Sequence, residues 1–481
     1  MAAWFIFAGP HVKNCCRNGP GRAAGREKGT EGLMKILFIS LGCDKNLVDT
    51  EMMLGTLVQK GYSITDDETQ AQAVVVNTCC FINDAKQESI NTLLEMAELR
   101  KSGGIKALIA AGCLAQRYRD EIQTEIPEVD AIVGTTAIDA IADALEEVLA
   151  GNHHKYLKDI SHMPAVYNHS AQHKRMVTTG GHYAYLKIAE GCDKHCSYCI
   201  IPKVRGHYRS IPMEELVQEA ERLVAFGAKE IILVAQETTL YGMDLYGRKC
   251  LPELLDRLCA VSGIYWVRLL YCYPEEITDE LIETIRKQEK VCSYLDIPIQ
   301  HASDRILKRM GRRTDRQELT EMIAKLREKI PEICLRTTLI TGFPGETEED
   351  HEVLLDFVDE MAFDRLGVFT YSPEEDTPAA LFEGQIDEAV KLERQAELME
   401  LQQEIAFEKA QDAMGSTLLV MVEGKVPDEH AYVARSYKDA PNVDGFVFIQ
   451  TARELMTGDF VRVKITGSYE YDLIGEIIGD Q

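Results

Sequence analysis

Three closely spaced cysteines are the part of this sequence best suited to chemistry. Cys192, Cys196 and Cys199 stand with three and then two residues between them. Cysteine thiolates are the usual ligands of iron–sulfur clusters, so three on one short loop can hold three irons of a 4Fe–4S cube. The loop has no fourth cysteine, which leaves the fourth iron open, as a catalytic metal site requires. The alternatives are a zinc loop completed by His195 or His207, or three unrelated core thiols.

Three further cysteines are distant in sequence but stand at equivalent places. Cys43, Cys79 and Cys113 each follow an apolar run that is typical of a buried strand. Their separations of 36 and 34 residues match one strand–helix–strand repeat. Open parallel sheets bind ligands at the edge where their strands end, so the fold can bring these three thiols to one place. Each of them could also be a small apolar core residue.

The apolar runs before these cysteines define a first unit, residues 34–150. Candidate strands alternate there with helical patterns, at Lys35–Ser40, Ala73–Thr78, Ile105–Gly112 and Ala131–Gly134. This alternation predicts a parallel sheet with right-handed crossovers, and therefore a doubly wound α/β domain.

A second alternating run, residues 183–414, must position the cysteines at 192–199. Six strand–helix units fit an incomplete TIM-like barrel, whose chemistry lies at the carboxyl ends of the strands. A helix rich in Glu, Leu and Gln follows, from about Asp387 to Met414. The candidate strands are Ala184–Ala189, Glu230–Ala235, Trp266–Tyr271, Tyr294–Gln300, Ile333–Thr341 and Arg365–Tyr371.

Three segments complete the chain. Residues 151–182 hold six of the twelve histidines, and their spacing fits a polar interdomain linker better than a metal site. Residues 415–481 alternate apolar and polar residues between turn signals, which predicts a small OB-like β-barrel. Residues 1–33 lack periodicity, so we expect a disordered segment or a spurious extension ahead of Met34, with a transit peptide as the alternative.

The composition is that of a soluble enzyme with a formal net charge of −26. No run reaches the roughly 18 apolar residues of a membrane-spanning helix, so we expect no membrane association. The fourteen cysteines are expected to be reduced in the cytoplasm, where clustered thiols serve metals or catalysis rather than disulfides. So acidic a chain suits a basic protein partner better than the phosphates of a nucleic acid.

The segment Gly191–Cys199 (GCDKHCSYC) resembles the signature of the radical S-adenosylmethionine (SAM) enzymes. The resemblance implies a 4Fe–4S cluster whose open iron binds SAM and passes it an electron, which yields methionine and a 5′-deoxyadenosyl radical. The cofactor supplies the difficult chemistry, while the protein positions the cofactor and excludes water from it. Tyr198, Gln236 and Arg336 stand where members of this family contact SAM, although Tyr198 could equally be a packing aromatic.

The phrases SLGCDKN, NTC and GCLAQR around Cys43, Cys79 and Cys113 resemble the amino-terminal domain of the methylthiotransferases of that family. The resemblance covers residues 34–481, including a TRAM-type terminal barrel. It implies that these cysteines hold a second 4Fe–4S cluster, which carries the sulfur, and that an external electron donor is needed. Cys80 could compete with Cys79, but Cys79 completes the Asn-Thr-Cys phrase. The cysteines expected in the core are Cys250, Cys259, Cys272, Cys292 and Cys334.

Two kinds of methylthiotransferase compete for the assignment. The RimO type modifies an aspartate β-carbon in a small-subunit ribosomal protein, whereas the MiaB type modifies an adenosine of tRNA. The phrases SLGCDKNLVDTE, Val368–Glu375 and Ala434–Gly445 resemble the RimO type. Residues 415–481 contain six basic and eleven acidic residues, and RNA-binding barrels of this kind rely on a basic groove. The prediction is therefore the RimO type, with tRNA as the alternative substrate.

A third hypothesis, from another class, is a non-catalytic iron–sulfur or zinc protein. Redox carriers usually coordinate every iron with protein ligands to protect the cluster. The two sets of only three cysteines argue against this class.

Overall fold

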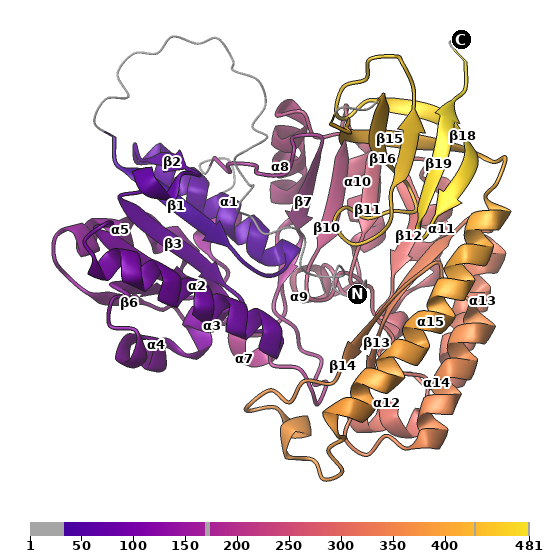
Figure 1. Cartoon of the computed structure of the whole chain (residues 1–481), viewed down its shortest axis with the longest axis horizontal. Helices are drawn as coiled ribbons and strands as arrows, with labels where there is room; N and C mark the ends of the chain where they lie inside the picture. Colours follow the sequence, from indigo (N-terminus) through magenta and orange to yellow (C-terminus); the bar gives the residue numbers. More distant parts are fainter. Residues whose placement is uncertain (1–32, 169–173, 428–429, 480–481) are drawn as a thin grey trace.

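The computed structural model describes residues 33–168, 174–427 and 430–479, and Figure 1 traces them from the amino-terminal sheet to the carboxy-terminal barrel. The sequence predictions for residues 1–32, with Cys15 and Cys16, and for His169 and His173 lie outside this range.

The amino-terminal unit is a parallel sheet of order β2-β1-β3-β4-β5-β6 with helices on both faces (Figure 1). Alternate side chains of a strand point to opposite faces. Phe38 and Val75 pack in one core with α1 and α5, while Leu37 and Val74 pack in another with α2. The predicted doubly wound arrangement is therefore confirmed. The elements are β1 (Lys35–Ser40), α1 (Asp44–Gln59), β2 (Ser63–Thr65), β3 (Ala73–Thr78), α2 (Asn83–Lys101), β4 (Ala107–Ala111), α3 (Gly112–Arg117), α4 (Arg119–Glu125), β5 (Ala131–Val133), α5 (Ile141–Leu149) and β6 (His154–Tyr156).

Two short edge strands of this sheet leave no pattern in the sequence. Strand β2 pairs with β1, and β6 pairs with β5 inside the segment expected to be a linker. Three residues cannot establish a period of two, so only pairing with an existing edge reveals such a strand.

The second unit is an open parallel sheet whose strands follow the chain in the order β7, β10, β11, β12, β13, β14. Helices cover its outer side, so the six strands form the incomplete TIM-like barrel that the sequence predicts (Figure 1). The strands are β7 (Tyr183–Lys187), β10 (Glu230–Val234), β11 (Trp266–Leu269), β12 (Val291–Asp296), β13 (Cys334–Thr341) and β14 (Arg365–Thr370). The helices are α7 (Ile201–Arg205), α8 (Met213–Ala225), α9 (Met243–Tyr246), α10 (Leu251–Ala260), α11 (Asp279–Lys287), α12 (Asp304–Met310), α13 (Arg316–Lys329), α14 (Glu348–Met361) and α15 (Glu388–Asp412).

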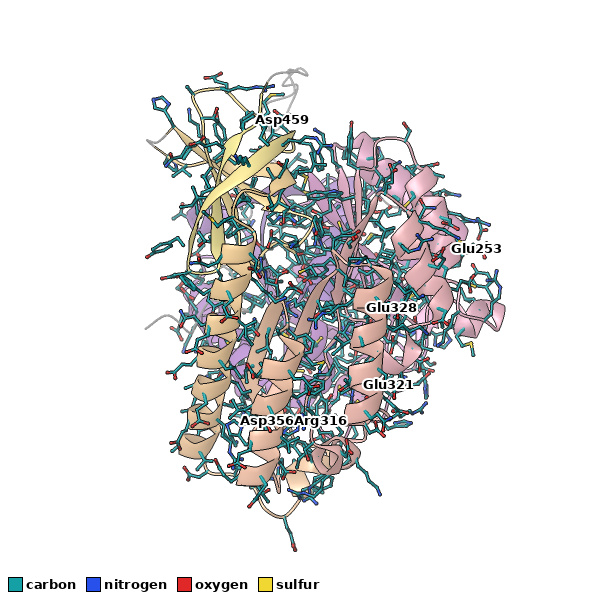
Figure 2. All side chains as sticks on the ribbon, turned by 90° about the vertical axis from the view of Figure 1, so that its right-hand side faces the viewer. Glu253, Arg316, Glu321, Glu328, Asp356 and Asp459 are labelled. Atoms are coloured by element: carbon teal, nitrogen blue, oxygen red, sulfur yellow. The ribbon has the colours of Figure 1, made fainter. Side chains whose placement is uncertain are left out.

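The outer helices present charged side chains to solvent. Figure 2 shows Arg316, Glu321 and Glu328 of α13 and Asp356 of α14 on this surface. Across the described ranges, no helix combines the length and the apolar character needed to span a bilayer.

The carboxy-terminal unit is a closed five-stranded barrel, as predicted, with the order β15-β16-β17-β19-β18. Alternate residues such as Val420, Val422 and Ala434 point into its core. Its strands are β15 (Thr417–Lys425), β16 (Ala431–Ser436), β17 (Val447–Gln450), β18 (Phe460–Tyr469) and β19 (Asp472–Ile477).

Buried ion pairs fasten this barrel to the open sheet. Glu230 of β10 accepts from Arg268 of β11 and from Arg435 of β16, each over 2.7 Å, and all three side chains are fully buried. Removing one partner of a buried ion pair leaves an uncompensated charge, which costs about 3–5 kcal/mol. The segment Ala434–Gly445 therefore includes a residue that binds the terminal barrel to the open sheet.

Candidate functional site

Cys43, Cys79 and Cys113 lie where strands β1, β3 and β4 end at one edge of the amino-terminal sheet. Cys43 is the N-cap of α1, and Cys113 lies in the first turn of α3. Gly42 has a φ of +91°, and a Cβ built on it would fall 2.6 Å from the Cβ of Cys79 and 2.7 Å from its sulfur. Only glycine therefore lets the loop that carries Cys43 lie against Cys79.

The third cysteine reaches the same place through a second glycine. Gly112 has a φ of +87°, and a Cβ there would fall 2.3 Å from Oδ1 of Asn77 and 2.5 Å from the carbonyl oxygen of Thr78. The close approach brings the end of β4 against the end of β3, so the fold assembles Cys43, Cys79 and Cys113, which we call the amino-terminal triad.

The electrostatics of this triad suit a cluster better than free thiols. Burial, together with the neighbouring thiols, raises the pKa of Cys79 well above its ordinary value. Burial also raises the pKa of Cys113, although Arg205 opposes the shift. Such thiols ionise only when a strong positive charge joins them, and metal ions deprotonate coordinating thiols outright. The donor set of three converging thiols thus fits an iron–sulfur cluster.

Cys80 occupies a different environment from Cys79. Its side chain is buried in the core formed with Val74 and Leu93, and burial raises its pKa to about 12. Cys79 instead lies against Gly42 and interacts with both Cys43 and Cys113, whereas Cys80 interacts with Cys113 and Arg117. These surroundings support Cys79 as the ligand.

The loop with Cys192, Cys196 and Cys199, the barrel triad, leaves the open sheet after β7. Short strands β8 (Ala189–Glu190) and β9 (Arg209–Ser210) pair at its base. Gly191 has a φ of +80°, and a Cβ there would fall 2.1 Å from the carbonyl oxygen of His207. Cys192 donates its N–H to the carbonyl oxygen of Gly206 over 3.1 Å.

The end of α12 supports the other side of this loop. The N–H of Ser197 donates to the carbonyl oxygen of Met310 over 2.8 Å. The hydroxyl of Tyr273, which follows β11, lies 3.5 Å from the sulfur of Cys196. Burial raises the pKa of Cys192 to about 12, so this thiol too needs a positive group to become ionised.

The proposed zinc alternative depended on His195 or His207. Both side chains are exposed, and His207 pairs with Asp193 over 2.8 Å. In residues 33–168, 174–427 and 430–479, no three His, Cys, Asp or Glu side chains are arranged around a position for a single metal ion.

The three residues expected to contact SAM lie in different surroundings. Gln236, after β10, accepts from the N–H of Gly191 and donates to Glu190, each over 2.9 Å, so it lies at the base of the barrel triad. Tyr198 packs edge-on against Phe343 of the Gly-Phe-Pro-Gly turn, with ring centres 6.4 Å apart. Arg336 of β13 pairs with Asp296 over 2.7 Å and with Asp444 of the terminal barrel over 3.5 Å.

A buried polar network, which the sequence did not reveal, joins the two triads. Arg205 donates to the sulfur of Cys113 over 3.3 Å and to Asp49 over 2.6 Å, and it also pairs with Glu190 over 3.2 Å. Glu190 in turn accepts from Gln236, which holds Gly191 next to Cys192. The two triads are therefore connected through four side-chain contacts.

The charges of this network balance one another. Lys187 donates to Asp49 over 2.5 Å and to Glu190 over 2.7 Å. Burial alone would raise the pKa of Glu190, but Arg205 and Lys187 hold it at about 2. Because the partners come from both units, the network fixes the position of the amino-terminal sheet against the barrel.

Glu237, beside Gln236, was also not predicted from the sequence. It is fully buried, burial raises its pKa to about 7, and its Oε2 has no hydrogen-bond partner among the described residues. Because its pKa is raised, this carboxyl next to the barrel triad can accept or, when protonated, donate a hydrogen bond to a bound group.

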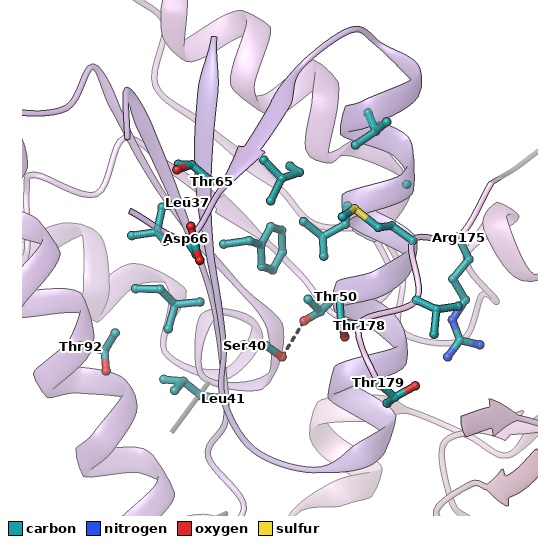
Figure 3. Close-up of a pocket in the computed structure, with 18 of the residues that line it drawn as sticks. Leu37, Ser40, Leu41, Thr50, Thr65, Asp66, Thr92, Arg175, Thr178 and Thr179 are labelled. Atoms are coloured by element: carbon teal, nitrogen blue, oxygen red, sulfur yellow. Dashed lines mark hydrogen bonds between the residues drawn. The ribbon is translucent and has the colours of Figure 1, made fainter. Parts of the chain in front are cut away.

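A cavity of about 1600 Å³ lies beside the triads rather than at them. Figure 3 shows its lining from β1, α1, α2 and the segment with Arg175 and Thr178, with a hydrogen bond between Thr50 and Ser40. The six cysteines are not part of this lining.

Three family descriptions match consecutive parts of the chain. "Uncharacterized protein family UPF0004" matches residues 35–134, "Radical SAM superfamily" matches residues 186–358, and "TRAM domain" matches residues 414–478. The first two matches contain the amino-terminal triad and the barrel triad, respectively.

Several relatives match over nearly the whole chain. The ribosomal protein uS12 methylthiotransferase RimO of Lachnoclostridium phytofermentans is 61% identical over 442 residues, which cover 92% of this chain and 99% of the relative. The proteins of the same name from Pelotomaculum thermopropionicum and Acetivibrio thermocellus are 52% and 50% identical, covering 92% and 93% of this chain and 99% of each relative.

Among solved structures, the fold is similar to the radical S-adenosylmethionine methyltransferase TsrM from Kitasatospora setae, a structure with cobalamin and a 4Fe–4S cluster bound. The TM-score is 0.52 at 12% identity, over 83% of this chain and 80% of that one. At this identity the likeness concerns the fold alone.

Proposed function

Because the chain belongs to the RimO family of ribosomal protein uS12 methylthiotransferases, we propose that it attaches a methylthio group to the β-carbon of an aspartate in uS12. The chain is a radical SAM methylthiotransferase, whose cofactors are an iron–sulfur cluster and SAM. The predicted family is thereby confirmed, and the relatives favour the RimO type over tRNA modification.

The observation that carries the proposal is the network between the two thiol triads. Methylthio transfer needs one site that produces a radical and another that presents the sulfur, and the substrate must reach both. Arg205, Glu190 and Gln236 connect Cys113 to the loop of Cys192, so one buried network joins the two triads across the units. This arrangement supports a two-cluster enzyme over a single-cluster carrier.

Each triad has a proposed role. Cys192, Cys196 and Cys199 hold the 4Fe–4S cluster that supplies the electron for SAM cleavage, and Cys43, Cys79 and Cys113 hold the cluster that supplies the sulfur. Cys79, Cys113, Cys192 and Cys196 are buried, while Cys43 and Cys199 are partly exposed, so each triad is largely shielded from water.

The proposed SAM contacts follow from the surroundings of the barrel triad. Gln236 holds the backbone of Gly191 beside Cys192, and Tyr198 offers a ring face supported by Phe343. Arg336, which pairs with Asp296 and Asp444, would reach SAM only by exchanging one of these partners.

The acidic character of the terminal barrel supports a basic protein substrate. Residues 415–481 carry nearly twice as many acidic as basic residues, which disfavours the phosphates of tRNA. The enzyme in this proposal receives the electrons for SAM cleavage from an external donor.

The test is anaerobic reconstitution of the purified chain, followed by reaction with reductant, SAM and either uS12 or tRNA. We expect about eight irons per chain and an equal amount of sulfide. Mass spectrometry should find one hydrogen of a single uS12 aspartate replaced by a methylthio group. Modified tRNA with unmodified uS12 would contradict the proposed substrate. About four irons per chain would contradict the second cluster. Bound zinc without SAM cleavage would contradict the radical SAM activity altogether.

A further inference from the structure

Lys45 is a buried cation two residues after Cys43, next to the carboxyl of Asp44, with which it interacts electrostatically. It lies in the first turn of α1, and only 7% of its surface is exposed. Its ammonium group lies 3.2 Å above the centre of the Tyr271 ring. In the part of the chain that the structure describes, no hydrogen bond or ion pair of this ammonium is found. The aromatic face attracts the charge but leaves three N–H donors without an oxygen acceptor.

Other buried cations near the two triads are already neutralised. Lys187 and Arg205 share Asp49 and Glu190, and Lys194 pairs with Glu275 over 3.1 Å. Lys45 differs from them because it forms no direct ion pair among the described residues: Asp44 interacts with it electrostatically but accepts its hydrogen bond from the hydroxyl of Tyr271, over 3.2 Å.

Arg312 also lacks a carboxylate partner, but it serves the other triad. Its guanidinium stacks on the ring of Tyr273, 4.3 Å from the centre, and donates to the carbonyl oxygen of Pro298. Tyr273 lies against Cys196, so Arg312 lies on the side of the barrel triad, whereas Lys45 adjoins Cys43.

Lys45 lies near residues that contact both triads. Cys43 places it beside the amino-terminal triad, and Tyr271 stands two residues before Tyr273, which contacts Cys196. Tyr271 has a φ of +61°, and its N–H donates to Asp296 over 3.0 Å, so its ring is held in place beneath the ammonium. A group bound to Lys45 therefore lies next to the amino-terminal triad and near the strand end that carries Tyr273 to the barrel triad.

We propose that Lys45 binds the side-chain carboxylate of the aspartate that the enzyme modifies. This inference rests on the proposed function, whose substrate carries this carboxylate. A buried carboxylate needs a cation and hydrogen-bond donors to replace water. Lys45 offers both, and the amino-terminal end of the α1 dipole adds positive potential. The same contact distinguishes aspartate from asparagine, because the neutral amide does not attract the ammonium.

The test measures binding of uS12 to the reconstituted enzyme by anaerobic calorimetry. Two forms of uS12 are compared: the natural protein, and a variant with asparagine at the aspartate that mass spectrometry identifies. We expect the wild-type enzyme to bind the aspartate form roughly 10- to 100-fold more tightly, the range for a hydrogen bond to a charged group. Lys45→Met and Lys45→Gln should abolish this preference, and Lys45→Arg should retain it.

The control is Lys60→Met, at the opposite end of α1, where the side chain is 48% exposed and pairs with Glu146. It should bind both forms as the wild type does, and the iron content of every variant reports whether the fold persists. If the wild-type enzyme binds the aspartate and asparagine forms of uS12 equally well, this result alone overturns the inference. A full preference in Lys45→Met or Lys45→Gln overturns it as well. If the wild type neither binds nor modifies uS12, the proposed function fails, and this inference falls with it.

Discussion

The guanidinium of Arg205 donates a hydrogen bond to the sulfur of Cys113 over 3.3 Å, although 92 positions separate the two residues in the sequence. Arg205 ends the short helix α7 that follows the barrel triad, and Cys113 belongs to the amino-terminal triad. One side chain thus spans the boundary between the two units. Four testable predictions follow from this boundary and from the groups around it.

Alanine substitutions should distinguish the functions of the two triads. Cys192→Ala, Cys196→Ala or Cys199→Ala should abolish formation of 5′-deoxyadenosine, because the electron source for SAM is lost. Cys43→Ala, Cys79→Ala or Cys113→Ala should leave SAM cleavage largely intact and stop methylthio transfer. Each substitution should lower the iron content from about eight to about four per chain. Loss of all iron from a single substitution would argue against two independent sites.

Cys79 and Cys80 should differ as ligands. Cys79→Ala removes a thiol that lies against Gly42 and should halve the iron content. Cys80→Ala removes a small side chain from an apolar core, so it should retain both clusters and lower the free energy of unfolding by about 1 kcal/mol. Iron analysis and urea unfolding distinguish the two variants. Halved iron content in Cys80→Ala, with full iron content in Cys79→Ala, would identify Cys80 as the ligand.

Arg205→Lys should change the reduction potential of the cluster that we propose Cys113 holds. Hydrogen bonds to cluster sulfurs stabilise the reduced state, so loss of this donor should shift the reduction potential of that cluster to a more negative value. A redox titration followed by electron paramagnetic resonance measures the shift. Arg205→Met should in addition lower the free energy of unfolding by about 3–5 kcal/mol, because Asp49 and Glu190 lose a buried partner.

Arg209 provides the matched control for Arg205. It stands four residues further along and donates to the backbone carbonyls of Ile160, Arg205 and His207. Arg209→Lys should leave the potential unchanged. An equal shift in both variants would mean that the loop conformation, and not the donor to Cys113, sets the potential.

Glu237 should make the stability depend on pH. Below about pH 4.5 its carboxyl is protonated in the folded and the unfolded chain alike, but burial keeps it protonated in the folded chain up to about pH 7. The folded state therefore binds the extra proton in this window, and its stability falls as the pH rises, by about 3 kcal/mol in total. In Glu237→Gln this fall should be absent when urea unfolding is measured between pH 5 and 8.

An exposed carboxylate serves as the comparison for Glu237. Glu253→Gln on α10 should keep the pH dependence of the wild type, since its partners Arg248 and Arg257 are themselves exposed. A wild-type profile in Glu237→Gln would show that this carboxyl is ionised in the folded protein.

The sequence by itself determined the features that repeat locally. Apolar runs followed by helical patterns established the two parallel sheets, because a buried strand and an amphipathic helix each leave a periodic trace over a few residues. The spacing of Cys192, Cys196 and Cys199 predicted a loop that can hold three irons of a 4Fe–4S cube. The strand–helix repeat predicted that Cys43, Cys79 and Cys113 meet at one sheet edge, which the fold confirms.

Only the tertiary structure decided which residues meet across the units. Arg205 and Cys113, or Lys45 and Tyr271, come together through the docking of one sheet against the other, and no local pattern encodes that contact. Strand β6 depends on pairing with β5 for the same reason. Periodicity reports which face of an element is buried, whereas the partner of a buried charge is set by the long-range packing that must neutralise it.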